Sequence, residues 1–155
     1  MTEDFGYISF INTMLSYGLA SPLYQEVREK KGLVYYVSCY LSILNKQAIN
    51  VISTLTSNDN VDEVNNSIKE VLTNPDKYIT QDRIDVIKDY YMVRKQKSEI
   101  LRYKNVNDII NDNQTVYDVL DNITLDKIKE VYQKYYSFDT YRISVDKTEF
   151  KRELV

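Results

Sequence analysis

The chain has 155 residues, of which 43% are apolar and 28% charged, a composition typical of one globular domain or part of one. It has no histidine and one cysteine, which excludes histidine-dependent catalytic triads, histidine-ligated metals, multi-cysteine zinc sites and internal disulfides. A net charge of −3 with scattered basic residues argues against nucleic-acid binding. No apolar run reaches the ~18 residues of a membrane span, and the acidic N-terminus favours a cytoplasmic protein.

The first predicted elements are two helices separated by a glycine. Apolar residues recur at helical spacing over residues 4–16 and predict a helix that Gly18 ends. Ser21-Pro22 has the pattern of an N-cap followed by proline at the first helical position. A second helix is therefore predicted over residues 22–31, with Gly32 as its C-terminal stop.

A β-hairpin is predicted next, because the apolar period changes from 3.6 to two. Residues 33–44 are rich in β-branched and aromatic side chains and predict a strand. Asn45-Lys46 is a plausible two-residue turn, and residues 47–56 predict the returning strand. Cys39 follows the apolar alternation, so we expect it to be a small core residue.

The remainder of the chain is predicted to be mostly helical. Thr80 and Thr124 are placed as N-caps, each before a run with helical periodicity. The predicted helices cover residues 61–72, 80–103, 106–121 and 125–135, and a short strand follows at residues 141–145. Since strands cluster and no βαβ alternation appears, we predict an α+β domain over residues 1–155, with helices packed on one face of a mostly antiparallel sheet.

Two residue patterns with possible chemistry have simpler explanations. The fifteen tyrosines fall mostly on apolar helical stripes, which indicates core packing rather than base stacking. Glu26 and Glu29 are three residues apart on a predicted helix, where paired carboxylates can act as acid and base. Their basic neighbours favour a solvated charged surface instead.

The segment from Ser21 to Val37 combines a helix, a glycine stop and a strand that begins with tyrosine. The chain reversal at Gly32 can bring Arg28 and Tyr35 to one edge. Arginine offers five N–H donors and tyrosine one O–H donor, which together can hold a peptide carbonyl or a developing oxyanion. The alternative is an arginine paired with a carboxylate and a half-buried aromatic residue.

The same residues match a recurring family pattern, L-G-x-G-x-S-S-x-L-[FY]-Q-E-[LV]-R-E-x-x-G-L-[AV]-Y. The chain has Leu15-Ser-Tyr-Gly18, Ser21, Leu23-Tyr-Gln-Glu-Val-Arg-Glu29 and Gly32-Leu-Val-Tyr35. It departs from the pattern at Tyr17, Leu19 and Pro22. The chain therefore resembles the second half-domain of the insulinase/pitrilysin family of zinc metallopeptidases, which includes the mitochondrial processing peptidases.

The resemblance implies how the chain contributes to peptide hydrolysis. In the family, one half-domain carries H-x-x-E-H and binds zinc, while the other contributes an Arg and a Tyr seven residues apart. The implied site residues are Arg28 and Tyr35, with zinc held by a partner half-domain in the same parent chain or in a separate subunit. The implied ligand is a peptide substrate, and this chain alone is expected to be inactive and to bind no zinc.

Two alternatives accompany this interpretation. The alternative function is a non-catalytic peptide-binding or scaffold subunit of the same architecture, since a fold does not determine a function. Strict alternation places Tyr35 on the apolar face with Val37, which makes Tyr36 the alternative exposed hydroxyl unless the strand start is twisted. Because family half-domains usually have strands before the first helix, we expect an N-terminally truncated half-domain with an exposed sheet edge that favours association.

Overall fold

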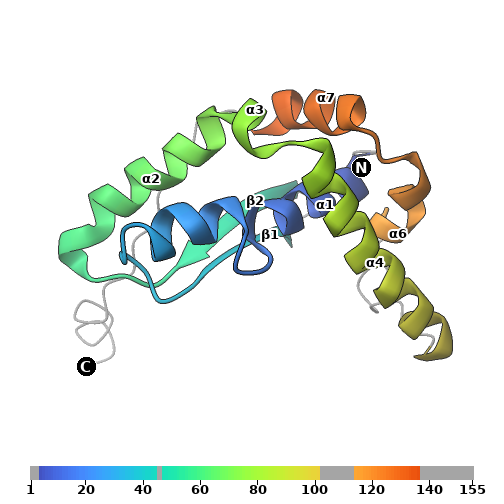
Figure 1. Cartoon of the computed structure of the whole chain (residues 1–155), viewed down its shortest axis with the longest axis horizontal. Helices are drawn as coiled ribbons and strands as arrows, with labels where there is room; N and C mark the ends of the chain where they lie inside the picture. Colours follow the sequence, from blue (N-terminus) through green and yellow to red (C-terminus); the bar gives the residue numbers. More distant parts are fainter. Residues whose placement is uncertain (1–3, 45–46, 102–113, 137–155) are drawn as a thin grey trace.

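The computed structural model describes residues 4–44, 47–101 and 114–136. Helices dominate, and one antiparallel pair of strands accompanies them, so the predicted α+β class is confirmed. In chain order the elements are α1 (Phe5–Ser16), η1 (Tyr24–Glu29), β1 (Val37–Leu44), β2 (Gln47–Thr54), η2 (Asn58–Asn60), α2 (Val61–Thr73), α3 (Pro75–Tyr78), α4 (Gln81–Leu101), α6 (Val116–Val119), η3 (Leu120–Asn122) and α7 (Leu125–Tyr135) (Figure 1).

The two strands form a sheet with one covered and one uncovered face. Cys39 pairs with Ile52, and Tyr40 pairs with Val51, in antiparallel register. Because side chains alternate across a strand, these two pairs point to opposite faces. Cys39 and Ile52 pack in the main core, whereas Tyr40 is 48% exposed. Within the described residues, helices therefore cover only one face of the sheet, as predicted.

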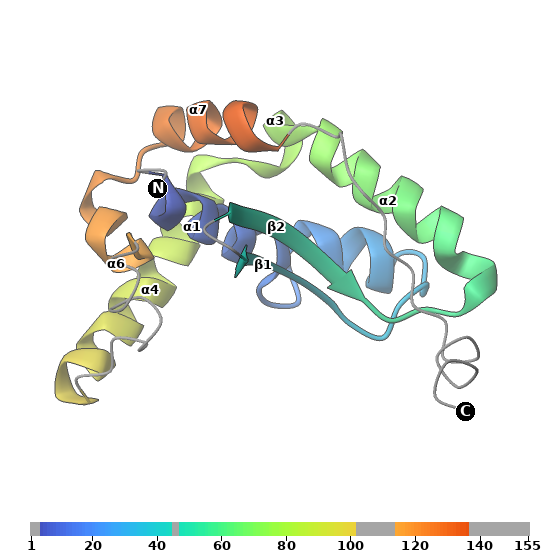
Figure 2. The same cartoon turned by 180° about the vertical axis from the view of Figure 1, so that it is seen from behind.

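Helix α1 lies at the centre of the molecule. It contacts β1 on one side, and α4, α6 and α7 pack against its other sides (Figures 1 and 2). Phe10, Ile11 and Met14 are completely buried. A helix that is apolar on nearly all sides has to be covered on nearly all sides, which explains the central position of α1.

A polar network fixes α1 on the covered face of the sheet. The Asn12 Oδ1 accepts hydrogen bonds from the Tyr136 hydroxyl at 2.6 Å and the Cys39 thiol at 2.9 Å. The Asn12 Nδ2 donates to the Asn50 Oδ1 at 2.7 Å. Burial raises the pKa of the Cys39 thiol to about 12, so this thiol stays neutral. The prediction that Cys39 is a core residue is confirmed.

A second, smaller core lies between η1 and α2. It consists of Val27, Leu33, Val34 and Val64. Ile68 of α2 packs against this core and also against the main one, so the two cores are continuous. In both views α2, α3 and α7 run along one edge of the molecule, while α4 extends away from it (Figures 1 and 2).

The second predicted helix has a different form in the structure. Residues 24–29 make a π-helical turn, in which the Lys30 N–H donates to the Gln25 carbonyl, five residues back, at 3.0 Å. The predicted side-chain cap at Ser21 is wrong, because its hydroxyl is buried without a hydrogen-bond partner in the described structure. The Gln25 N–H instead donates to the Ser21 carbonyl at 2.9 Å.

The later helices begin at their predicted caps. The Thr124 hydroxyl accepts from the Lys127 N–H at 3.2 Å, and the Thr80 hydroxyl accepts from the Arg83 N–H at 3.4 Å. Of the helix predicted over residues 106–121, the described part forms two short turns, α6 and η3. The predicted turn at 45–46, the helix over 106–113 and the strand at 141–145 lie outside the described residues. No helix in the described part is long and apolar enough to cross a membrane.

Candidate functional site

A tight chain reversal at Gly32 connects η1 to β1. Its φ of +62° lies in the left-handed region, which glycine adopts without strain. The Gly32 N–H donates to the Arg28 carbonyl at 2.8 Å, and the Leu33 N–H donates to the Val27 carbonyl at 3.0 Å. Tyr35 lies two residues after Leu33, a span of at most about 7 Å. The reversal therefore keeps the backbones of Arg28 and Tyr35 at the same end of the molecule.

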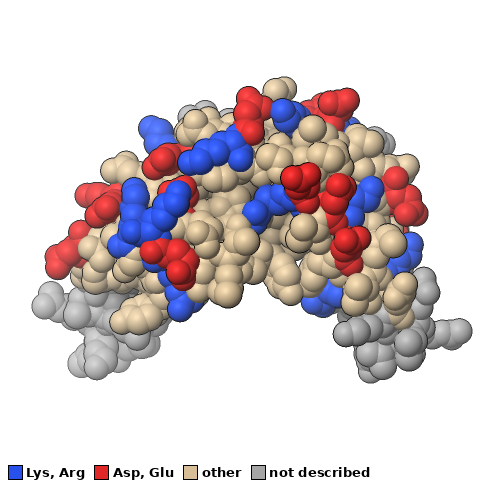
Figure 3. Space-filling model, viewed as in Figure 1, with Lys and Arg blue, Asp and Glu red and all other residues tan. Residues whose placement is uncertain are grey.

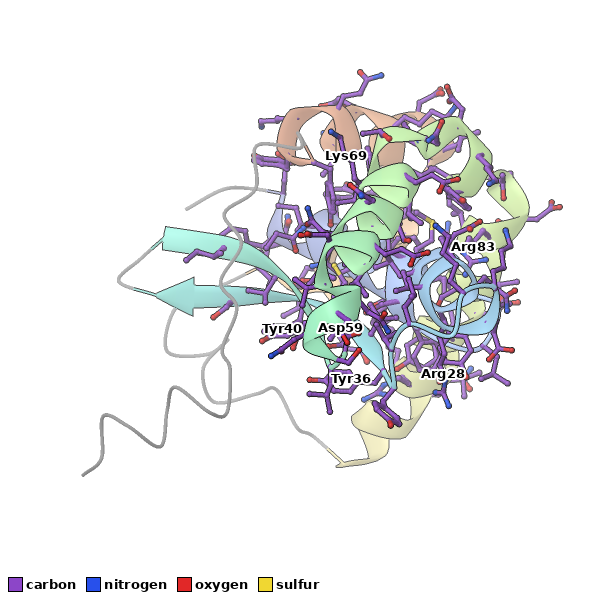
Figure 4. The ribbon with its side chains drawn as sticks, turned by 90° about the vertical axis from the view of Figure 1, so that its left-hand side faces the viewer. Arg28, Tyr36, Tyr40, Asp59, Lys69 and Arg83 are labelled. Atoms are coloured by element: carbon purple, nitrogen blue, oxygen red, sulfur yellow. The ribbon has the colours of Figure 1, made fainter. Side chains whose placement is uncertain are left out.

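Arg28 is exposed, and its guanidinium lies over the ring of Tyr24, 4.9 Å from the ring centroid. Figure 4 shows Arg28 at the edge of the molecule, on η1. Within the described residues no carboxylate forms an ion pair with it, and no side-chain hydrogen bond occupies its N–H groups. The alternative in which Arg28 pairs with a carboxylate is therefore not found in the described part of the chain.

The two lysines that follow Arg28 differ from it in having polar partners. The Lys30 ammonium pairs with the Glu26 carboxylate, and the Lys31 ammonium donates to the Ser67 hydroxyl at 2.9 Å. Each of these lysines thus contributes to contacts within the fold. Arg28 alone in this basic cluster keeps its donors available to a ligand, as far as the described residues show.

Tyr35 and Tyr36 are both exposed, with 77% and 46% of their surfaces accessible. The Tyr36 hydroxyl lies 3.4 Å from the Ser53 hydroxyl, whereas the Tyr35 hydroxyl has no partner among the described residues. The Tyr35 N–H donates to the Leu55 carbonyl at 3.2 Å, which holds its backbone beside the chain that leaves β2. Tyr35 is therefore held by its backbone, and its side chain makes no hydrogen bond to another residue in the described part of the chain.

The strand predicted to start at Leu33 starts at Val37, and strict alternation before that point is wrong. Leu33 and Val34 are adjacent yet both buried, because both fill the small core against α2. Tyr35 and Tyr36 then both face outward, and alternation begins at Val37. Tyr35 is exposed although Val37 is buried, so the alternation that would place both on one face does not hold before β1 begins.

The sequence predicts that Glu26 and Glu29 form a solvated charged surface, and the structure confirms this for Glu29 but not for Glu26. Glu29 is exposed, but Glu26 is only 5% exposed. Its carboxylate accepts a hydrogen bond from the Tyr78 hydroxyl at 2.9 Å in addition to the Lys30 contact. The hydrogen bond from Lys30 lowers the pKa of the Glu26 carboxyl, against the opposing effect of burial. Glu26 thereby joins η1 to α3.

Sequence reasoning missed Glu26 as an anchor and Tyr24 as the support of Arg28. The available signal was the spacing of four residues, from Glu26 to Lys30 and from Tyr24 to Arg28. Tyr78 gave no such signal, because it lies 52 residues from Glu26 and meets it only in the folded chain.

The described residues contain no group of three or more metal-ligating side chains. The face shown in Figure 3 carries interspersed acidic and basic side chains rather than a single basic patch. The described residues therefore offer no cluster of metal ligands, and the face in Figure 3 has no basic patch of the kind that binds nucleic acid. The exposed donors at the Gly32 turn are the candidate site.

Comparisons with known proteins agree with this picture. Residues 1–91, more than half of the chain, match the family described as the peptidase M16 inactive domain. The chain belongs to this family. Membership in M16 confirms the resemblance to insulinase-type metallopeptidases that the Leu23–Tyr35 segment predicted. No curated protein matches the chain.

Two crystal structures share the fold of this M16 chain. A conserved protein from Enterococcus faecalis V583 has a TM-score of 0.62 and 22% identity, over 86% of this chain and 33% of that chain. A peptidase M16 inactive domain from Pseudomonas fluorescens has a TM-score of 0.50 and 20% identity, over 88% of this chain and 32% of that chain. The M16 chain described here thus spans about a third of the length of these solved chains.

Proposed function

We propose that this M16 chain is the zinc-free half of a metallopeptidase, in which Arg28 and Tyr35 donate hydrogen bonds to the backbone of a bound peptide. The observation that carries the proposal is the pair of exposed side chains at the Gly32 turn, whose donors have no partner among the described residues. Family membership supports it, because these residues lie within the matched part of the chain.

Arg28 and Tyr35 have the chemistry to stabilise a negative charge that develops on the carbonyl oxygen of a bound peptide. A guanidinium presents several N–H donors in a fixed plane and stays positively charged, and a phenol adds one short-range donor. Donors placed around a peptide carbonyl oxygen stabilise it most strongly when it becomes an oxyanion. Arg28 and Tyr35 would therefore bind the substrate and stabilise the transition state, without providing a nucleophile.

The residues of this chain do not fit a zinc site, since the sequence has no histidine and the described part has no cluster of ligands. We therefore assign the zinc and the general base to a second M16 half-domain, in the same parent chain or in a separate subunit. Zinc bound there supplies an activated water. The role of this chain is to position the peptide and to donate hydrogen bonds to it.

The first prediction concerns peptide turnover by this chain assembled with the zinc-bearing half. We expect Arg28→Ala and Tyr35→Phe each to lower kcat/KM by about 10²–10³-fold, the usual loss for one oxyanion donor. The measurement is steady-state cleavage of a fluorogenic peptide. Tyr36→Phe is the matched control, because its hydroxyl lies beside Ser53, and it should cleave at the wild-type rate.

Two results would overturn this proposal. Wild-type turnover by both Arg28→Ala and Tyr35→Phe would show that these donors play no part in the reaction. An assembled complex that binds the peptide but never cleaves it would instead indicate a peptide-binding or scaffold subunit.

A further inference from the structure

The guanidinium of Arg28 lies over the face of the Tyr24 ring. The Arg28 Cζ lies 4.9 Å from the centre of the Tyr24 ring. Tyr24 is partly buried and packs against the main core, which restricts the movement of its ring. The exposed Arg28 side chain thus lies over a ring that packs against the core.

An aromatic ring and a carboxylate hold an arginine in different ways. A ring attracts the cation through its π face and makes no conventional hydrogen bond with the guanidinium N–H groups. A carboxylate takes two N–H donors in its bidentate geometry and neutralises the charge. An arginine held only by a ring is therefore restricted in position while its donors and its charge remain available to a ligand.

Another pair in the same chain shows the contrast. The Arg94 guanidinium lies over the Tyr90 ring, 5.4 Å from its centre. However, the Arg94 Nη1 also donates to the hydroxyl of Tyr90 at 2.7 Å, so one of its donors is occupied. Arg28 has no such hydrogen bond to Tyr24 or to another described residue.

We propose that Tyr24 is a positioning residue, which holds the Arg28 guanidinium for a peptide carbonyl by its ring face and leaves the N–H donors free. The proposal rests on the function proposed above for Arg28. It adds that the aromatic ring at position 24, and not its hydroxyl, sets how well Arg28 binds the peptide. Preorganisation of this kind reduces the cost of ordering a side chain when the ligand binds.

The test compares ring and hydroxyl variants in the assembled peptidase. Tyr24→Phe keeps the ring and should retain the wild-type kcat/KM. Tyr24→Leu removes the ring but keeps apolar volume against the core, and should lower kcat/KM by about two- to fivefold, consistent with the strength of an exposed cation–π contact. Tyr90→Leu, which removes the ring beneath Arg94, is the matched control and should have no effect.

A double-variant cycle separates positioning from a general structural role. In an Arg28→Ala background, Tyr24→Leu should cause no further loss, because the side chain it positions is already gone. An undiminished loss in that background would overturn the proposal. If Arg28→Ala lowers turnover and Tyr24→Leu does not, only this inference fails. If Arg28→Ala has no effect, the proposed function fails.

A direct measurement on the 155-residue chain completes the test. The Nε–Hε signal of Arg28 in a ¹⁵N NMR spectrum, assigned by its loss in Arg28→Lys, should shift in Tyr24→Leu and remain in place in Tyr24→Phe. Tyr24→Met provides a second ring-free variant should Tyr24→Leu fold poorly. An Arg28 signal that does not move in either ring-free variant would overturn the proposal without any assay of turnover.

Discussion

At the scale of single residues, the charges of η1 have two different roles. Glu26 is buried and accepts hydrogen bonds from Tyr78 and Lys30, with the Lys77 ammonium 3.5 Å from its carboxylate. A buried carboxylate is tolerated only when it is paired, and here its partners are Lys30, directly after η1, and two residues of α3. Arg28, in the same turn, has only a ring as its partner among the described residues. Glu26 therefore stabilises contacts inside the fold, whereas Arg28 lies on the surface, where a ligand can reach it.

Glu26→Gln should lower the free energy of unfolding by about 1–2 kcal/mol at pH 7, because charged hydrogen bonds are replaced by neutral ones. The pKa of the Glu26 carboxyl is lowered in the folded state, so the unfolded state takes up protons first as the pH falls below the ordinary value of 4.5. The difference between the variant and the wild type should therefore shrink towards pH 3. Urea unfolding of the variant and the wild type at pH 7 and at pH 3 measures this difference in stability.

The matched control is Glu29→Gln, in the same turn but exposed and outside the described ion pairs. It should change stability by less than about 0.5 kcal/mol, as most surface substitutions do. A Glu26→Gln variant as stable as the wild type at pH 7 would contradict the anchoring role of Glu26.

At the scale of elements, the connection from η1 to β1 determines the geometry of the candidate site. Gly32 reverses the chain, Leu33 and Val34 fill the small core, and the two tyrosines face outward before β1 begins. In a regular strand of a sheet covered on one face, only every second residue is buried, so Leu33 and Val34 can both be buried only before β1 begins.

Gly32→Ala should destabilise the chain by about 1 kcal/mol, because a Cβ is strained at a φ of +62°. Open space surrounds the position, so backbone conformation and not a clash is the cause. Gly32→Asn should cost less, since asparagine tolerates the left-handed region better than alanine. Chemical denaturation of the three proteins gives the comparison, and equal stability of Gly32→Ala and wild type would contradict it.

At the scale of the whole molecule, the uncovered face of the sheet is an exposed surface without charged side chains among the described residues. Within the described residues it carries tyrosine, serine and aliphatic side chains and no charge: Tyr36, Ser38, Tyr40, Ser42, Ile49, Val51 and Ser53. Exposed surfaces of this kind promote association between molecules. The expected exposed sheet edge adds to this tendency.

Ile49→Lys should reduce concentration-dependent self-association measured by sedimentation velocity. Ile49 is 49% exposed on the uncovered face, so a lysine there disrupts apolar contact between molecules at little cost to folding. Ala48→Lys is the control, because Ala48 is exposed on the same strand but pairs with Ile43 on the other face. Equal association of both variants would show that this face is not the one involved.

Much of the fold and the identity of the candidate residues could be predicted from local patterns. Thr124 begins α7 as its position before an apolar period predicts, and Gly32 stops the preceding helix as glycine usually does. The motif between Leu15 and Tyr35 led to the same family that the comparison over residues 1–91 shows. These features depend on short stretches of chain, where spacing and residue type are sufficient information.

The sequence by itself determined most of the helices, the pair of antiparallel strands, the lack of histidine ligands and the motif around Arg28. Only the tertiary structure decided that Glu26 is buried, that Tyr35 and Tyr36 both face outward, and that η1 is a π-helical turn. The reason is that a residue is buried only when another segment packs over it, and that segment can be far away in the sequence. Tyr78 reaches Glu26, and α2 covers Leu33 and Val34, only after segments distant in sequence have come together.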